Sequence, residues 1–252
     1  MELFLSRERA PVALAVGGLA ALAWAWLIPA SRDMYGGMQG LAAWMMRGTW
    51  DAAYFAQIFL MWAVMMLGMM LPSAAPAILL FARAIRGNGA AGQRVTAFIA
   101  GYALAWSAFS LAATVAQWAL AQAALLSPMM QLSQPALGSA LLVAAGLYQW
   151  SAAKAQCLAR CRAPFEFITR HFRPGVTGAL RLGAQHGLYC VGCCWALMLL
   201  LFAGGVMSLA WIGAISLFVL LEKLAPHGAQ GGRLSGAVLI LLGIAGTIAA
   251  LR

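Results

Sequence analysis

Three of the chain's five cysteines lie within the five residues from Cys190 to Cys194, in a segment that is otherwise apolar. His186 precedes Cys190 by four residues, and Met198 follows Cys194 by four. Residues four apart share one face of an α-helix, so a helix here presents imidazole, thiol, thiol and thioether groups in one stripe, with Cys193 beside it. These ligand types suit soft metal ions, above all Cu(I), and also Zn.

Cys157 and Cys161 form a second thiol pair, again four residues apart, at the start of a basic stretch. Together with the cluster at 190–194, this pair offers enough thiolates for trigonal Cu(I) or tetrahedral Zn. The odd number of cysteines excludes a fully paired disulfide framework within one chain. For a single cysteine in an apolar helix, the simpler interpretation is a small buried hydrophobe.

A dense group of methionines lies in an earlier apolar segment, where Met61, Met65 and Met69 fall on one helical face with Met66 and Met70 beside them. Thioethers suit Cu(I), but a methionine stripe at helical spacing is more often core packing. We therefore expect these thioethers to bind metal only together with the thiols. The candidate metal ligands are Cys157, Cys161, His186, Cys190, Cys193, Cys194, Met65, Met66, Met69 and Met70, and no residue is assigned a catalytic role.

The composition places these residues in a polytopic membrane protein. The 252-residue chain is 64% hydrophobic and 9% charged, whereas soluble domains have about 25% charged residues. The 27 glycines suit close helix packing in lipid. Basic cytoplasmic loops explain the net charge of +10 better than nucleic-acid binding does, so we expect no nucleic-acid partner.

The apolar runs predict an all-α fold: a single-domain transmembrane helical bundle of about seven spans. Pro72 predicts a kink in the second span, and Gly204-Gly205 predicts the turn that separates the fifth span from the sixth. We interpret residues 31–51 as a loop with a short surface helix and residues 154–185 as the longest polar connection. The predicted spans are 11–30, 52–82, 95–120, 135–152, 186–203, 206–222 and 233–251.

The basic residues predict the orientation of the bundle. With the N-terminus in the cytoplasm, all of them except Arg32, Arg47 and Arg252 lie on the inner side. This asymmetry favours a cytoplasmic N-terminus and a periplasmic C-terminus, and it places the five cysteines toward the cytoplasmic face, where thiols are kept reduced. We interpret Glu222 and Lys223 as a self-contained interfacial pair, with balance of the cluster's charge or proton relay as the alternative.

Several motifs occur along the chain in one order: Met61 to Pro76; Tyr148-Gln149 with Lys154, Cys157 and Cys161-Arg162; Gly187 to Trp195 with Leu197-Met198; Gly205-Val206-Met207 with Trp211; and Glu222-Lys223. Through these motifs, from about residue 50 to 228, the chain resembles a bacterial family of predicted metal-binding integral membrane proteins. The resemblance implies a metal-binding membrane protein without defining the metal or a reaction. Ser208 departs from the pattern, in which Asn is expected.

We therefore expect a multi-pass protein of the bacterial inner membrane that binds Cu(I), or Zn as the second choice, for transport or for delivery to a membrane metalloenzyme. Its expected partners are the lipid bilayer, the metal ion, and other membrane subunits or a copper enzyme. We expect a binding protein rather than an enzyme. Two alternatives remain open: a membrane thiol–disulfide oxidoreductase that uses Cys190 and Cys193, and an accessory structural subunit of a larger membrane complex.

Overall fold

The computed structural model describes residues 10–37, 41–45, 49–86 and 90–250. Its described elements are helices, apart from one isolated bridge between Leu126 and Leu132, so the all-α prediction is confirmed. Arg7, Arg9, Arg47 and Arg252, which enter the predicted charge asymmetry, lie outside the described residues. The helices are α1 (Ala10–Tyr35), α2 (Leu41–Met45), α3 (Ala52–Ala84), α4 (Ala91–Gln122), α5 (Pro135–Gln149), α6 (Ala152–Arg162), α7 (Pro164–His171), α8 (Gly175–Leu199), α9 (Leu201–Gly204), α10 (Leu209–Leu224) and α11 (Gly228–Ala250).

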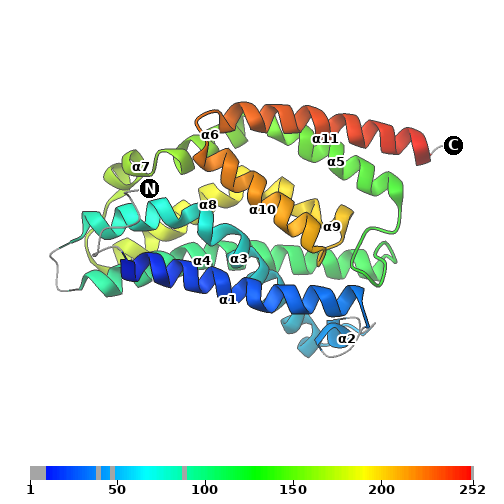
Figure 1. Cartoon of the computed structure of the whole chain (residues 1–252), viewed down its shortest axis with the longest axis horizontal. Coiled ribbons are helices and arrows are strands. Elements are labelled where there is room, and N and C mark those ends of the chain that lie inside the picture. The colour runs from blue at the N-terminus through cyan, green and yellow to red at the C-terminus, as the bar shows by residue number, and fades with distance from the viewer. Residues whose placement is uncertain (1–9, 38–40, 46–48, 87–89, 251–252) are drawn as a thin grey trace.

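The long helices run roughly side by side along the long axis of the molecule, with α5 and α11 paired along one edge (Figure 1). Within the described residues, α1, α3, α4, α8 together with α9, and α11 are each long and apolar enough to cross a membrane. The pair α5 and α6, bent by 62°, adds a sixth candidate. The predicted count of seven also requires α10, which has 16 residues.

Several helices extend beyond the predicted spans. Residues 154–185, expected to be a polar connection, fold into α6, α7 and the first part of α8. α8 begins earlier than predicted because its first turns already have a buried face, which includes Ala179 and Leu182. α3 continues through Pro72 as one helix of 33 residues. The predicted turn at Gly204-Gly205 is present, and Gly205 has a φ of +94°, a left-handed conformation that glycine adopts without steric cost.

α4 and α8 approach so closely that their backbones touch. A Cβ atom on Gly183 would lie 1.9 Å from the Phe98 carbonyl oxygen, and one on Gly101 would lie 2.0 Å from that of Leu180. Small residues permit this kind of approach between helices. The contact fixes the middle of α8, which carries three cysteines, against the aromatic side chains of α4.

Candidate metal centre

Cys190 lies at the centre of a buried polar cluster between α3, α4, α8 and α10. Its sulfur accepts a hydrogen bond from Lys223 Nζ at 2.8 Å and lies 3.1 Å from the Tyr102 hydroxyl. Lys223 Nζ also donates to Ser73 Oγ at 3.0 Å. Cys190 is 1% exposed and Lys223 is 7% exposed. Since a buried ammonium group needs compensating partners, its position beside a sulfur marks this thiol as unlike an ordinary core cysteine.

The next two cysteines of α8 converge on the same turn. The thiols of Cys193 and Cys194 each donate a hydrogen bond to the Cys190 carbonyl oxygen at 3.0 Å. Because both sulfur atoms contact the same oxygen, they lie close to each other. Cys194 Sγ also lies 3.9 Å from Met70 Sδ on α3. Tyr102 of α4 contacts both α3 and α8, because its hydroxyl donates to the Met70 carbonyl oxygen at 3.1 Å and also lies beside the Cys190 sulfur.

α6 brings the second pair of thiols to α8. The Cys161 side chain interacts with the side chains of Cys190 and Cys193. Cys157 Sγ lies against α8 where residue 192 has no side chain, because a Cβ on Gly192 would be 2.7 Å from that sulfur. Tyr148 of α5 supports the same point by donating to the Gly192 carbonyl oxygen at 2.5 Å. The fold therefore gathers all five cysteines along the α6–α8 interface.

His186 lies one helical turn before Cys190 and is 3% exposed. Its ring packs among aromatic side chains, with centroid distances of 5.4 Å to Phe167 and 6.0 Å to Tyr102. Within the described part of the chain, its Nδ1 atom has no hydrogen-bond partner. Buried side-chain nitrogens are normally paired, so this atom remains a candidate donor to a bound ion.

The methionines of α3 divide into two groups. Met70 reaches the thiols, whereas Met65, Met66 and Met69 lie in the hydrophobic core along the same helix and are at most 2% exposed. The sulfur–sulfur contact with the thiols therefore involves Met70, one of the four candidate thioether ligands. The other three remain predictions from the sequence.

Glu222 does not pair with Lys223, and the expected self-contained pair is wrong. Its carboxylate pairs with Lys154 Nζ of α6 at 2.8 Å, and the two side chains are 0% and 3% exposed, respectively. Gly232 of α11 leaves room for this carboxylate, because a Cβ there would lie 2.2 Å from Glu222 Oε1. Arg162 donates to the carbonyl oxygens of Glu222 and Ala225, placing a cation at the C-terminus of α10.

The sequence did not identify Tyr102, Ser73 and Lys223 as partners of the thiols. The available signal was a lysine near the end of an apolar helix, since intramembrane charges are usually functional. No spacing pattern pointed to Tyr102 or Ser73, because their contacts join segments that are distant in the sequence.

The arrangement provides soft ligands without a preformed coordination shell. In the part of the chain that the structure describes, no three or more His, Cys, Asp or Glu side chains are arranged to hold a metal ion. The thiols of Cys193 and Cys194 instead donate to a carbonyl, and Cys190 is bonded by Lys223. Five thiols, one thioether in contact and an unpaired imidazole nitrogen nevertheless form a donor set that fits Cu(I).

Comparison with known proteins gives one family match. Residues 59–246 match the model of the family PpoB2, described as a copper chaperone. The matched segment is well over half of the chain and contains the five cysteines, the methionines of α3 and Lys223. No curated protein and no solved structure shows significant similarity to the chain.

Proposed function

The chain belongs to the PpoB2 family of copper chaperones, and we propose that it is an integral membrane protein that binds Cu(I) at its buried thiols and passes it on. The observation that carries this proposal is the convergence of Cys190, Cys193 and Cys194 on one turn of α8, with Met70 in sulfur contact. Thiolate and thioether ligands together select Cu(I), whereas a thioether adds little for Zn.

The outer helices support a location in lipid. α1 and α11 expose large apolar side chains, including Leu14, Leu22, Leu234 and Leu241, and extended apolar surfaces of this kind mark interaction with a partner or a membrane. α1 begins and α11 ends at opposite ends of the molecule (Figure 1), as an odd number of crossings requires. α10, about 24 Å long, would be the seventh span, with the bilayer of about 30 Å adapting to it.

The charge pattern supports the proposed orientation in a bacterial inner membrane. The basic helix α6, which carries Lys154 and Arg162 as well as Cys157 and Cys161, and the last turn of α3, which carries Arg83, lie toward the same end of the molecule (Figure 1). Basic residues collect on the cytoplasmic side of such membranes. In this orientation, α6 delivers copper toward the cytoplasmic end. α10 and α11 run in opposite directions, so their last residues lie on opposite sides of the bilayer.

Binding is an exchange of protons for copper. Each thiol that binds Cu(I) would release its proton to the medium. For Cys193 and Cys194, a sulfur–copper bond would replace the hydrogen bond from the thiol to the Cys190 carbonyl oxygen. Lys223 moves off the Cys190 sulfur and keeps Ser73 Oγ as a partner. Met70 and His186 Nδ1 are the neutral donors that complete the site, and Cys157 and Cys161 receive the ion on the α6 side. The final recipient is a membrane copper enzyme or another membrane subunit.

Replacing Cys190 and Cys194 with serine tests this function. Elemental analysis of the protein, purified in mild detergent after growth with copper, should show about one copper or more per chain in the parent and background copper in the Cys190→Ser/Cys194→Ser variant. Ala196→Ser is the matched control, because it adds a hydroxyl to the same helix and keeps both thiols. Unchanged copper and zinc contents in the double variant would contradict the proposal.

One observation favours a second candidate, a membrane thiol oxidoreductase. A lysine ammonium beside Cys190 is the kind of environment that makes a cysteine reactive. This alternative predicts that mild oxidation lowers the free-thiol count of the parent by two while its copper content stays constant. Chaperone function predicts instead that bound copper protects these thiols from the oxidant.

A further inference from the structure

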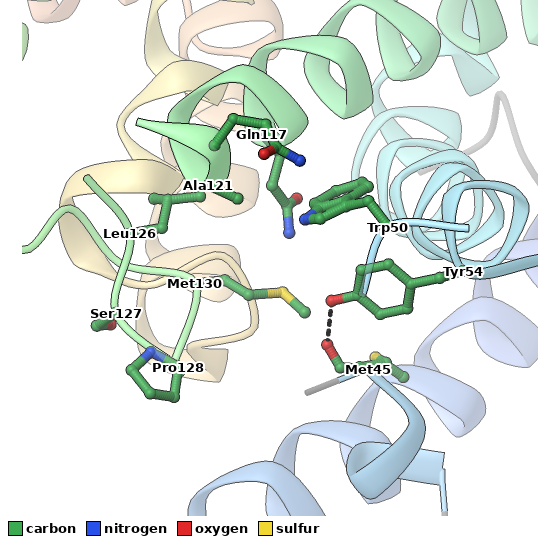
Figure 2. A pocket seen from close by; sticks show the side chains of 10 residues that line it. Met45, Trp50, Tyr54, Gln117, Ala121, Leu126, Ser127, Pro128 and Met130 are labelled. Carbon is green, nitrogen blue, oxygen red and sulfur yellow. Dashed lines mark hydrogen bonds between the residues drawn. The ribbon is translucent and has the colours of Figure 1, made fainter. Parts of the chain in front are cut away.

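A cavity of about 300 Å³ lies at the start of α3, several turns before this helix contacts the thiols (Figure 2). From Tyr54 in its wall to Met70 beside the thiols, α3 rises about 24 Å. The cavity is therefore separate from the cysteine cluster. Its walls come from α2, the start of α3, the end of α4 and the connection between α4 and α5.

Two thioethers from different elements meet at this cavity. Met45 ends α2 and is 1% exposed, and Met130 belongs to the α4–α5 connection and is 4% exposed. Figure 2 shows the Met130 side chain extending toward Tyr54 and Met45. The Tyr54 hydroxyl donates to the Met45 carbonyl oxygen at 2.5 Å, which fixes the end of α2 at the wall of the cavity.

The backbone at Met130 adopts a conformation that a simple packing residue does not require. Its φ is +54°, in the left-handed region that residues other than glycine rarely occupy. Such conformations are strained and cluster at functional sites. The loop is held by a bond from Met130 N to the Ser127 carbonyl oxygen at 2.9 Å and one from Leu132 N to that of Phe202 at 2.8 Å. These bonds hold the backbone of the loop that carries Met130.

The remaining groups favour a cation. Trp50 and Tyr54 line the cavity as an edge-to-face pair with ring centroids 4.8 Å apart, and the face of an indole ring attracts cations. Asp51, between them in sequence, is exposed and caps α3 by accepting from Tyr54 N at 2.7 Å. The cavity wall therefore combines two soft sulfur ligands with two aromatic rings, and a carboxylate caps the first turn of the adjoining helix.

The cavity also connects to the methionines of α3. Gln117 of its wall accepts a hydrogen bond from Trp62 Nε1 at 2.7 Å, and Trp62 is adjacent to Met61. From there the buried thioethers follow one another along α3 to Met70, whose sulfur contacts Cys194 at 3.9 Å. In order along the helix, these residues are Met61, Met65, Met66, Met69 and Met70.

We propose that this cavity is an entry site for Cu(I), with the sulfur atoms of Met45 and Met130 as ligands and the Trp50 ring beside the ion. The proposal rests on the proposed copper function and adds the point where the ion enters. Two thioethers hold Cu(I) without deprotonation, so the ion moves on to the methionines of α3 and reaches the thiols, which bind it more tightly.

Titration of the purified full-length chain with Ag(I), a redox-stable stand-in for Cu(I), tests the entry site through tryptophan fluorescence. In the Cys190→Ser/Cys194→Ser background, Ag(I) should quench a component of the emission that is absent in Trp50→Phe. Met45→Leu/Met130→Leu should weaken the apparent affinity for this quenching at least about tenfold. Met129→Leu is the matched control and should leave it unchanged. Met-to-Leu changes conserve volume, so the variants should remain folded.

The outcomes separate the two proposals. Equal affinity in the parent and in Met45→Leu/Met130→Leu overturns the entry site, and copper bound at the thiols would still stand. If the tenfold loss occurs while Cys190→Ser/Cys194→Ser keeps its full copper content, the entry site stands and the thiol centre fails. Binding of Ag(I) without quenching of the Trp50 component would overturn the assignment of the ion to this cavity.

Discussion

Lys154 and Lys223 are both buried, yet they meet opposite kinds of partner. Lys154 pairs with the Glu222 carboxylate at 2.8 Å, whereas Lys223 donates to the Cys190 sulfur at 2.8 Å and to Ser73 Oγ at 3.0 Å. Glu222 and Lys223 are neighbours on α10, and each residue turns a helix by about 100°, so their side chains face different helices. One lysine closes a structural ion pair, and the other places a positive charge at the proposed metal centre.

Breaking the ion pair is expected to have the largest effect. Lys154→Met leaves the Glu222 carboxylate buried without its cation, and removing one partner of a buried pair costs about 3–5 kcal/mol. Thermal unfolding in detergent should show a corresponding loss of stability. Adding Glu222→Leu should restore most of it, because no buried charge remains. A Lys154→Met variant as stable as the parent would remove the distinction between the two lysines.

Gly192→Ala tests how α6 joins the two regions, since α6 carries both Lys154 and the thiol pair. A Cβ at residue 192 would lie 2.7 Å from Cys157 Sγ, so that side chain must rotate or the helices must separate, at a cost of about 1–3 kcal/mol. The measurement is the free energy of unfolding together with the copper content. Gly213→Ala is the control, because a Cβ there meets nothing within 4 Å. Equal stability of the two variants would show that Cys157 does not need the space at residue 192.

Lys223→Met is expected to change stability least and chemistry most. Its partners are a thiol and a hydroxyl, which remain acceptable in the core when neutral, so stability should change by less than about 1.5 kcal/mol. Alkylation of Cys190 by a small thiol reagent at fixed pH should slow about tenfold, because a neighbouring cation favours the reactive thiolate. Ser73→Ala keeps the ammonium group and serves as the control. A rate equal to that of the parent would mean that Lys223 does not activate the thiol.

The local pattern predicted much of the fold, because apolar length and helical spacing are properties of consecutive residues. It located the start of α3, the turn at Gly205 and the stripe from His186 to Cys194. It placed the start of α8 too late, since polar residues such as Arg181 on an exposed helix face resemble a loop in a hydropathy pattern. It also assigned Glu222 to Lys223, because neighbours in sequence are the partners that a sequence makes visible.

The sequence by itself determined an all-helical, strongly apolar chain with soft donor groups at helical spacing, because composition and periodicity are properties of consecutive residues. Only the tertiary structure decided which distant side chains meet. It brought Cys161 to Cys190 and Cys193, Met70 to Cys194, and Lys223 to Cys190. Such contacts depend on how α3, α6, α8 and α10 pack against one another, and that packing follows from close approaches at glycines and from buried hydrogen bonds that no local pattern encodes.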